Sequence, residues 1–351
     1  MQYKLSILIP CLNEILTIER VISVAQKAGK KYLGRKFEVI VADNGSTDGT
    51  LKKLSKINNI RILNIPIKGY GAALHYGILS AKAPHILFAD ADLSYDFNEL
   101  YKFIPFLDGQ HDLVLGSRLK GNIYKGAMPH LNRYIGTPVL TFLINIIYGI
   151  KSSDCNSGMR LVSKSFYKKL KMKNCGMEWA SELLIKSALN TVRYNEVPII
   201  FKKDQRGKEP NLKRWQDGWR HLKVILLTKP IIFVASAIVL ALVGLFFIPF
   251  SPFTTIAFFL IAEFFIFSYM AARMIESAIQ KEQNFVSIFL AKTPTVKIAM
   301  VITFFGFLQL FLISDNHLFT KYIFLFQAIL FDLWLFFVET INTHIVNRLP
   351  D

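Results

Sequence analysis

The chain has 351 residues, of which 52% are hydrophobic and 13% aromatic, yet its formal net charge is +17. This composition excludes a disordered chain, which is poor in apolar residues, and argues against an ordinary soluble enzyme with balanced charge. The positive charge and the excess of apolar residues lie in different parts of the chain, which divide at Pro230. Residues 1–230 carry a net charge of +18 and residues 231–351 a net charge of −1. The sequence therefore predicts a basic globular domain, residues 1–228, followed by a membrane domain, residues 229–351.

Strand and helix signals alternate through the first part of the globular domain. Helical spacing is clear after Ile15, where Ile18, Val21, Ile22 and Ala25 fall on one face. The alternation predicts an α/β domain with a mostly parallel sheet covered by helices on both faces. Strands are expected at 5–9, 37–42, 60–65 and 85–89, and helices at 15–28, 46–56 (capped by Ser46, Thr47 and Asp48) and 70–81.

Polar residues collect where these strands end, at Asn13-Glu14, Asp43-Asn44 and Asp90-Ala91-Asp92. In open parallel sheets, ligands bind outside the carboxyl ends of the strands. The paired carboxylates of Asp90 and Asp92 are ligands that suit Mg²⁺ or Mn²⁺. A helix cap is the ordinary alternative for an isolated Asp-x-Asp, but this pair ends an apolar strand, which favours a metal and diphosphate site.

The glycine pattern excludes two common nucleotide-binding classes. No Gly-x-Gly-x-x-Gly follows the first strand and no Walker-type Lys-Ser/Thr occurs, so a Rossmann dehydrogenase or a P-loop nucleotidase is not expected. Gly69-Tyr70-Gly71 follows the third strand instead. Two interpretations stay open here: a close approach of the backbone to a ligand, or a flexible helix entry.

Four apolar stretches of near-membrane length occupy the last third of the chain, at about 231–250, 253–272, 297–313 and 322–341. Met1–Pro10 has no basic signal-peptide region, and Lys and Arg are concentrated in the loop 273–297. By the positive-inside rule, we expect a multi-pass protein of the inner (cytoplasmic) membrane whose first domain faces the cytoplasm. Carboxylates at Glu263, Asp332 and Glu339 fall inside these stretches, either as a polar path or as neutral or interface-near groups.

Two further segments favour an interfacial position. Residues 131–149 are apolar with almost no charge beyond Arg133, and residues 213–229 are amphipathic with Trp215 and Trp219. The basic domain would be attracted to an anionic leaflet, and because its charges are spread out without a nucleic-acid motif, no nucleic-acid partner is expected. Cys11, Cys155 and Cys175 show no metal-binding or redox spacing and are expected to be reduced.

At this point, the ordered motifs resemble those of the family-two glycosyltransferases with the GT-A fold, in particular the polyprenyl-phosphate glycosyltransferases such as dolichol-phosphate mannose synthase and the bacterial undecaprenyl-phosphate glucosyltransferases. The resemblance covers about residues 4–228. Its motifs lie at 9–14 (Ile-Pro-Cys-Leu-Asn-Glu), 41–50, 68–74, 90–94, 116–118 (Gly-Ser-Arg) and 154–160, with a basic stretch at 206–220.

The resemblance implies roles only for positions that match. Asp90 and Asp92 would hold Mg²⁺ or Mn²⁺ and the diphosphate. Many members have Gln where Ser94 stands, which leaves the sugar unassigned. The implied catalytic residues are Asp90, Asp92, Arg118, Arg133 (lipid phosphate) and Arg206, and the implied nucleotide-sugar-binding residues are Pro10, Leu12, Glu14, Val41, Asp43, Ala91, Ser94 and Lys213.

The implied function is transfer of a hexose, from a UDP-hexose by analogy, to polyprenyl (undecaprenyl) phosphate with inversion, for modification of a cell-envelope glycan. The membrane helices could also mediate homo-oligomers. One alternative is a processive polysaccharide synthase, for which Asn211–Trp215 is a near miss of Gln-x-x-Arg-Trp and Glu178-Trp179 lacks the expected acidic pair. Another is a non-catalytic transporter or flippase subunit that only binds a sugar nucleotide.

Overall fold

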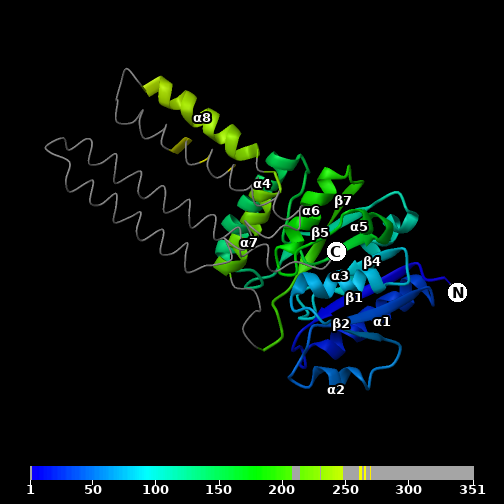
Figure 1. Ribbon diagram of the computed structural model, residues 1–351. Coiled ribbons are helices and arrows are strands. Elements are labelled where there is room, and N and C mark those ends of the chain that lie inside the picture. Colours follow the sequence, from blue (N-terminus) through cyan, green and yellow to red (C-terminus); the bar gives the residue numbers. More distant parts are fainter. Residues whose placement is uncertain are drawn as a thin grey trace, which may run out of the picture. The chain divides into compact units, whose positions relative to one another are not determined.

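A computed structural model of the chain describes residues 2–207, 214–229 and 231–247, together with positions 261, 262, 265 and 269 (Figure 1). The chain divides into two compact units, with the boundary between Ile225 and Leu226. The first unit contains all the strands among the described residues. It is the part of the molecule that carries the predicted motifs.

The first unit is built on a seven-stranded sheet with the order β3-β2-β1-β4-β6-β5-β7. The pairs β1–β2, β1–β4, β2–β3 and β5–β7 are parallel, whereas β6 runs antiparallel to both β4 and β5. The predicted α/β class with a mostly parallel sheet is therefore confirmed. The strands are β1 Leu5–Cys11, β2 Phe37–Asp43, β3 Arg61–Asn64, β4 His85–Phe88, β5 Leu113–Ile123, β6 Arg160–Ser163 and β7 Tyr194–Phe201.

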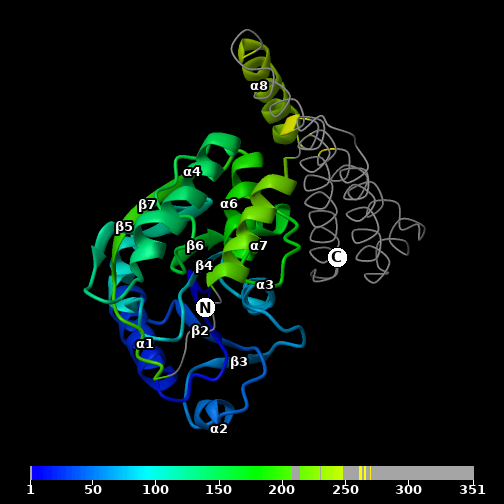
Figure 2. The same cartoon turned by 90° about the vertical axis from the view of Figure 1, so that its left-hand side faces the viewer.

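Helices cover both faces of the central strands, which is why β1 is buried along its whole length (Figure 2). Alternate residues of β1 (Leu5, Ile7, Ile9) pack with the apolar stripe of α1, Ile18–Leu33. On the other face, α3 (Tyr70–Ser80) approaches so closely that a Cβ at Gly77 would lie 2.4 Å from the Leu8 side chain. The carboxyl ends of β1, β2 and β4 therefore meet at one edge, between these two helical layers.

The predicted capping of the second helix was wrong in detail. The helix α2 spans only Thr50–Leu54, after Gly49 in the left-handed region. Asp48 accepts from the Thr50 backbone N–H, but Ser46 and Thr47 bind Asn13 instead. These hydrogen bonds tie the loop after β2 to the loop after β1, so tertiary pairing displaced the local cap.

The second half of the unit adds helices around β5, β6 and β7. A π turn, η3 Asn132–Gly136, runs directly into α4, Thr137–Tyr148. Both lie inside the predicted interfacial segment 131–149. The remaining elements are η1 Phe97–Lys102, η2 Ile104–Asp108, α5 Lys164–Lys169, α6 Trp179–Leu189 and α7 Arg214–Leu227.

The second unit is described mainly through α8, Ile231–Phe247, a helix whose only polar side chain is that of Ser236. Within the described ranges, no single helix is both long and apolar enough to cross a membrane; Trp215–Leu227 and Ile231–Val243 meet that test only as a pair interrupted by a short break. The predicted spans 297–313 and 322–341, most of 253–272 and the carboxylates Glu263, Asp332 and Glu339 lie outside the described residues.

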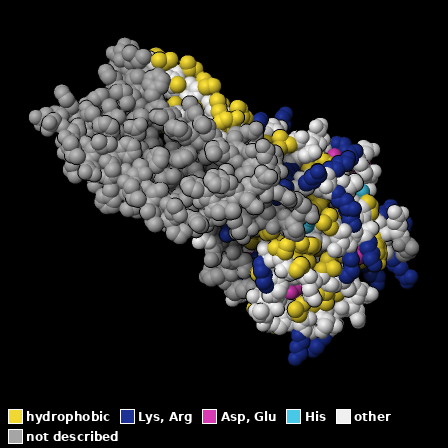
Figure 3. Space-filling model, viewed as in Figure 1, with side chains coloured by type: hydrophobic (Ala, Val, Ile, Leu, Met, Phe, Trp, Pro, Cys, Tyr) yellow, Lys and Arg dark blue, Asp and Glu magenta, His cyan; other side chains and the backbone are white. Residues whose placement is uncertain are grey.

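Surface charge and cysteine state can be read from the described residues. On the face seen in Figure 3, Lys and Arg side chains are scattered over the first unit rather than gathered in one stripe. The three cysteines are free and buried, as predicted.

Candidate active site

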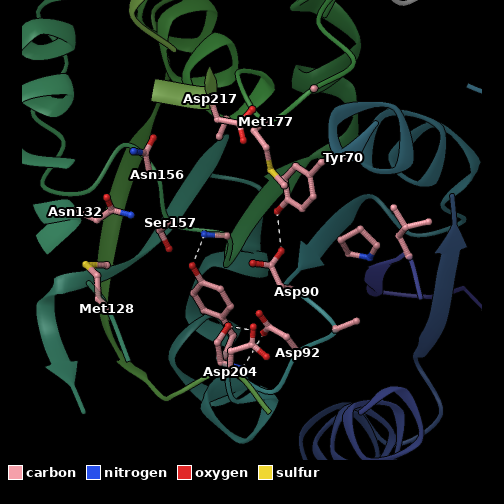
Figure 4. Close-up of a pocket in the computed structure, with 18 of the residues that line it drawn as sticks. Tyr70, Asp90, Asp92, Met128, Asn132, Asn156, Ser157, Met177, Asp204 and Asp217 are labelled. Atoms are coloured by element: carbon pink, nitrogen blue, oxygen red, sulfur yellow. Dashed lines mark hydrogen bonds between the residues drawn. The ribbon is translucent and has the colours of Figure 1, made fainter. Parts of the chain in front are cut away.

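A cavity of about 590 Å³ opens at the carboxyl ends of β1 and β4 (Figure 4). It is walled by the loops after these strands on one side and by η3, α4, α6 and α7 on the other. Of the predicted site residues, nine line it: Pro10, Leu12, Glu14, Asp90, Ala91, Asp92, Ser94, Arg118 and Arg206. Sequence positions nearly 200 residues apart thus come together in one site.

Asp90 is fixed in the floor of the cavity by two neighbours. The Tyr70 hydroxyl donates a hydrogen bond of 2.8 Å to Asp90 Oδ1. The other oxygen, Oδ2, occupies space that only a glycine at position 158 leaves open, since a Cβ there would lie 2.6 Å from it. Burial, together with the negative charge of Asp92, raises the pKa of Asp90 to about 7.

Asp92 lies at a sharp turn that follows the strand. Leu93 has φ of +65°, a conformation that few non-glycine residues adopt and that is enriched at functional sites. The turn brings the Ser94 backbone N–H (2.9 Å) and hydroxyl (2.5 Å) onto Asp92 Oδ1. Ser94 therefore holds Asp92 in place within the described structure.

The Arg206 guanidinium pairs with carboxylates from three separate segments. It donates to Asp92 Oδ2 and lies 3.4 Å from Glu14 Oε1 and 2.6 Å from Asp204 Oδ2. Its loop is pinned to the same turn, because the Gln205 N–H donates to the Asp92 carbonyl at 3.0 Å. A cation is thus held where the buried acids would otherwise repel one another.

The side of the cavity where the sequence predicts the nucleotide is lined by Pro10, Leu12, Glu14, Asn44 and Lys68. Asp43 and Val41 do not line it. Asp43 is buried, and its Oδ2 accepts from the Gly45 and Ser46 N–H groups, while its Oδ1 has no hydrogen-bond partner among the described residues.

Val41 is fully buried in the middle of β2, in the core beneath α1. The prediction that Val41 contacts the nucleotide is therefore wrong for this cavity.

The two glycines around Tyr70 make room for close packing against the 174–179 segment. A Cβ at Gly69 would lie 2.2 Å from the Cys175 carbonyl, and one at Gly71 would lie 2.6 Å from the Trp179 Cβ. Gly69 also has φ of +133°. This packing fixes the Tyr70 side chain above Asp90, and since Gly69 also lines the cavity, the close approach of its backbone to a ligand stays a prediction.

The predicted cations are placed differently from one another. Arg118 lines the cavity, but its Nε and Nη2 both bind Asp154 at 2.7 Å, so the guanidinium is occupied by a buried ion pair. Arg133 is half-buried, lies over the Tyr134 ring and is not among the lining residues. Lys213 lies outside the described residues.

Several lining residues were not singled out from the sequence. Asn132, Asn156, Met177, Asp217 and His221 all border the cavity. Asn156 belongs to the 154–160 motif, and Asp217 falls within the basic stretch 206–220. Asn132 lies in η3, Met177 directly before α6 and His221 in α7, and nothing in the sequence indicated that these three side chains border a site.

The oxygen atoms around Asp90 and Asp92 fit a hard divalent cation. Mg²⁺ and Mn²⁺ favour carboxylate oxygens, and burial, then the negative charge of Asp92, raises the pKa of Asp90, which a bound cation would counter. Among the described residues no group of three or more His, Cys, Asp or Glu side chains is placed to hold a metal ion.

Residues 6–171 match Glycosyl transferase family 2. The dolichyl-phosphate hexose transferase of Haloferax volcanii is 30% identical over 184 residues, which are 52% of this chain and 76% of that protein. The chain belongs to glycosyl transferase family 2. It is thereby placed among the glycosyltransferases, and its sheet is that of the expected GT-A fold.

Other relatives match over part of their length. Agl6, the low-salt glycan biosynthesis hexosyltransferase of Haloferax volcanii, is 36% identical over 242 residues, or 68% of this chain, and the chain spans 57% of that relative. A solved structure of glucosyl-3-phosphoglycerate synthase from Mycobacterium tuberculosis, in complex with Mn²⁺, UDP and phosphoglyceric acid, is 21% identical with a TM-score of 0.48, covering 64% of this chain and 77% of that one.

Proposed function

We propose that this family member transfers a hexose from a nucleotide diphosphate sugar, a UDP-hexose by preference, to polyprenyl phosphate at a membrane surface, with inversion at the anomeric carbon. The observation that carries the proposal is the cavity itself. One side presents Asp90, Asp92 and Arg206, which suit a metal-bound diphosphate. The other side is the inner face of α4, a helix whose outer face is apolar and exposed.

The outer surface of η3 and α4 suits a lipid surface. Its large apolar side chains are exposed by 42–67%, which is unfavourable in water. We call this the exposed apolar face; it consists of Leu131, Tyr134, Ile135, Val139, Phe142 and Ile146. Since Asn132, Gly136 and Leu140 of the same helical segment line the cavity, a lipid phosphate bound near this face would lie beside the site.

The chemistry needs positioning of anions rather than a strong base. A lipid monophosphate is already largely ionised at neutral pH, because its second pKa is about 6. A divalent cation held by Asp90 and Asp92 supplies positive charge that stabilises the leaving diphosphate. Arg206 is close enough to Asp92 to turn toward that diphosphate, and Arg133 and Arg220, at or near the cavity, would offset repulsion between the two anions.

The proposal includes the membrane arrangement expected from the sequence. The second unit would anchor the chain through helices in the last third, with the first unit on the cytoplasmic side of the cytoplasmic membrane. The positive charge of the first unit would strengthen contact with an anionic leaflet. The named Haloferax relative with a dolichyl-phosphate acceptor supports a polyprenyl phosphate as the acceptor class.

A panel of radiolabelled nucleotide sugars, supplied to the full chain in membranes with polyprenyl phosphate and Mn²⁺ or Mg²⁺, tests the function. We expect label in butanol-extractable lipid with one donor, and none when EDTA is added. Label in polymer would favour a processive synthase, and binding without transfer by any donor would favour a non-catalytic subunit. Either result would overturn the proposal.

A further inference from the structure

The wall of the cavity opposite Asp90 carries two asparagine side chains that no step above uses. Asn132 and Asn156 both line the cavity, across from Tyr70 and Asp90 (Figure 4). Within the described structure the Asn132 amide has no hydrogen-bond partner. The Asn156 side chain meets only the Cys155 thiol, at 3.4 Å, so its amide nitrogen is unused.

Asn132 lies on the side of its helical segment that borders the cavity. Residues four apart fall on one stripe of a helix, and Asn132, Gly136 and Leu140 line the cavity, whereas Tyr134 and Ile135 are more than half exposed. In the π turn η3, the Thr137 N–H bonds to the Asn132 carbonyl, five residues back.

Asn156 is carried by a loop that is firmly fixed to the same helix. The Cys155 N–H donates to Thr141 Oγ1 of α4 at 3.1 Å. On the other side, Ser157 Oγ donates to the Gly116 carbonyl and the Gly158 N–H to the Tyr95 hydroxyl. The two amides therefore sit on connected, anchored supports, as a preorganised binding pair requires.

The chemistry of this wall differs from that of a phosphate site. Both amides are neutral, and each offers two N–H donors and a carbonyl acceptor, which matches hydroxyl groups that both donate and accept. Leu140, which lines the cavity on the same helical segment as Asn132, provides apolar surface for the C–H face of a sugar ring. A phosphate would instead favour cations, such as the guanidinium on the other side.

From this arrangement we infer that Asn132 and Asn156 bind the hydroxyls of the donor hexose and determine which hexose is accepted. The inference rests on the proposed function, since it places the sugar of the donor beyond the diphosphate held near Asp90 and Asp92. Asn132 and Asn156 would then select the sugar, whose identity the residue at Ser94 left unassigned.

The test compares binding of a nucleotide sugar with binding of the matching nucleotide alone. Full-length wild type, Asn132→Ala and Asn156→Ala are titrated with UDP-glucose, UDP-galactose and UDP in detergent with Mn²⁺ by calorimetry, and with GDP-mannose and GDP if UDP does not bind. We expect each variant to bind the sugar nucleotide roughly 3- to 10-fold more weakly, the loss of one or two neutral hydrogen bonds, with the affinity for the nucleotide diphosphate unchanged.

Preference between the hexoses should also shrink in the variants, and Asn156→Gln, which keeps the amide, should retain more of it than Asn156→Ala. Asn58→Ala, which removes an exposed amide that does not line the cavity, serves as the matched control and should behave as wild type. Equal loss of sugar nucleotide and nucleotide binding, or no loss of either, would overturn the assignment of the hexose to this wall. If wild type binds no nucleotide, the proposed function fails instead.

Discussion

The two sides of the cavity differ in electrostatic character although one sheet supports both. The strand-end side concentrates the carboxylates of Glu14, Asp90, Asp92 and Asp204 around one guanidinium, that of Arg206. The helical side presents the amides of Asn132 and Asn156, apolar side chains and the buried His221, whose pKa burial lowers to about 4, and its charged residues Asp217 and Arg220 pair with each other. The contrast teaches that the clustered carboxylates come from the loops at the strand ends, whereas the helical segments supply most of the uncharged lining.

The largest expected effect comes from removing charge on the acidic side. Asp90→Ala should lower transfer at least about 100-fold, because an electrostatic stabiliser of the diphosphate is lost. Transfer of label to lipid by the purified full chain measures it. Asp108→Ala, which removes a 41% exposed carboxylate in a turn, is the control and should keep wild-type activity. Normal transfer by Asp90→Ala would show that the metal site is wrongly assigned.

A second, double substitution tests whether the exposed apolar face contributes to transfer independently of the acidic side. Phe142→Asp with Ile146→Asp should reduce transfer to long-chain polyprenyl phosphate in vesicles by about 10-fold or more, the cost of losing apolar burial. Transfer to a short, water-soluble isoprenoid phosphate should stay near normal, since the cavity is untouched. Leu189→Asp alters a similarly exposed leucine on α6 and should affect neither acceptor. Equal losses with both acceptors would argue that this face is not a lipid contact.

A smaller effect is expected at the hydrogen bond that orients Asp90. Tyr70→Phe removes only the hydroxyl that donates to Asp90 Oδ1, and should weaken Mn²⁺ binding about 10-fold, as expected for a hydrogen bond to a charged group. Electron paramagnetic resonance titration of Mn²⁺ in the presence of UDP reports the affinity, and the melting temperature reports folding. Tyr134→Phe, on the exposed apolar face, is the control. Unchanged Mn²⁺ affinity would mean that Tyr70 is only a packing residue.

The smallest effect concerns the neutral side and pH. His221 is uncharged in the folded state because burial, and secondarily Arg160, lowers its pKa to about 4, and Ser181 Oγ lies 2.7 Å from its Nδ1. The unfolded chain therefore binds a proton near pH 6.5 that the folded chain does not, and stability falls as pH drops from about 6.5 toward 4, by at most about 3 kcal/mol.

His221→Gln should remove part of that pH dependence. Melting temperatures of the full chain between pH 7 and 4.5 should decline a few degrees less in the variant, about 2–4 °C. Two other histidines, the half-buried His75 and the buried His85, also have lowered pKa values and titrate equally in both proteins, so the difference isolates His221. Parallel curves would show that this side chain does not set the acid sensitivity.

Much of the central sheet could be predicted because its signals are local. Apolar runs ending in Asp43 or Asp90 mark strands, and the stripe from Ile18 to Ala25 marks a helix. The start of α2 was mispredicted because Asn13, 33 residues away from Ser46, took the groups expected to cap it. A long-range hydrogen bond of this kind leaves no local trace in the sequence.

The candidate site divides in the same way. The acidic pair and Arg206 could be proposed from motif residues, whereas the positions of Asn132 and His221 could not, since they depend on how η3 and α7 pack. Arg118 illustrates the limit: a motif names the arginine, but only the fold shows that Asp154, 36 residues later, binds it.

The segregation of charge and apolarity at Pro230, the α/β class and the strand-end acids were determined by the sequence itself, because composition, hydrophobic period and residue type are properties of short segments. The tertiary structure decided which cations stay available and which amides face the cavity. It also decided why a side chain is excluded at three positions, Gly69, Gly71 and Gly158. These features depend on contacts between distant segments at separations of a few ångströms. Close packing, which admits a glycine and excludes a single Cβ, is the physical reason for the difference.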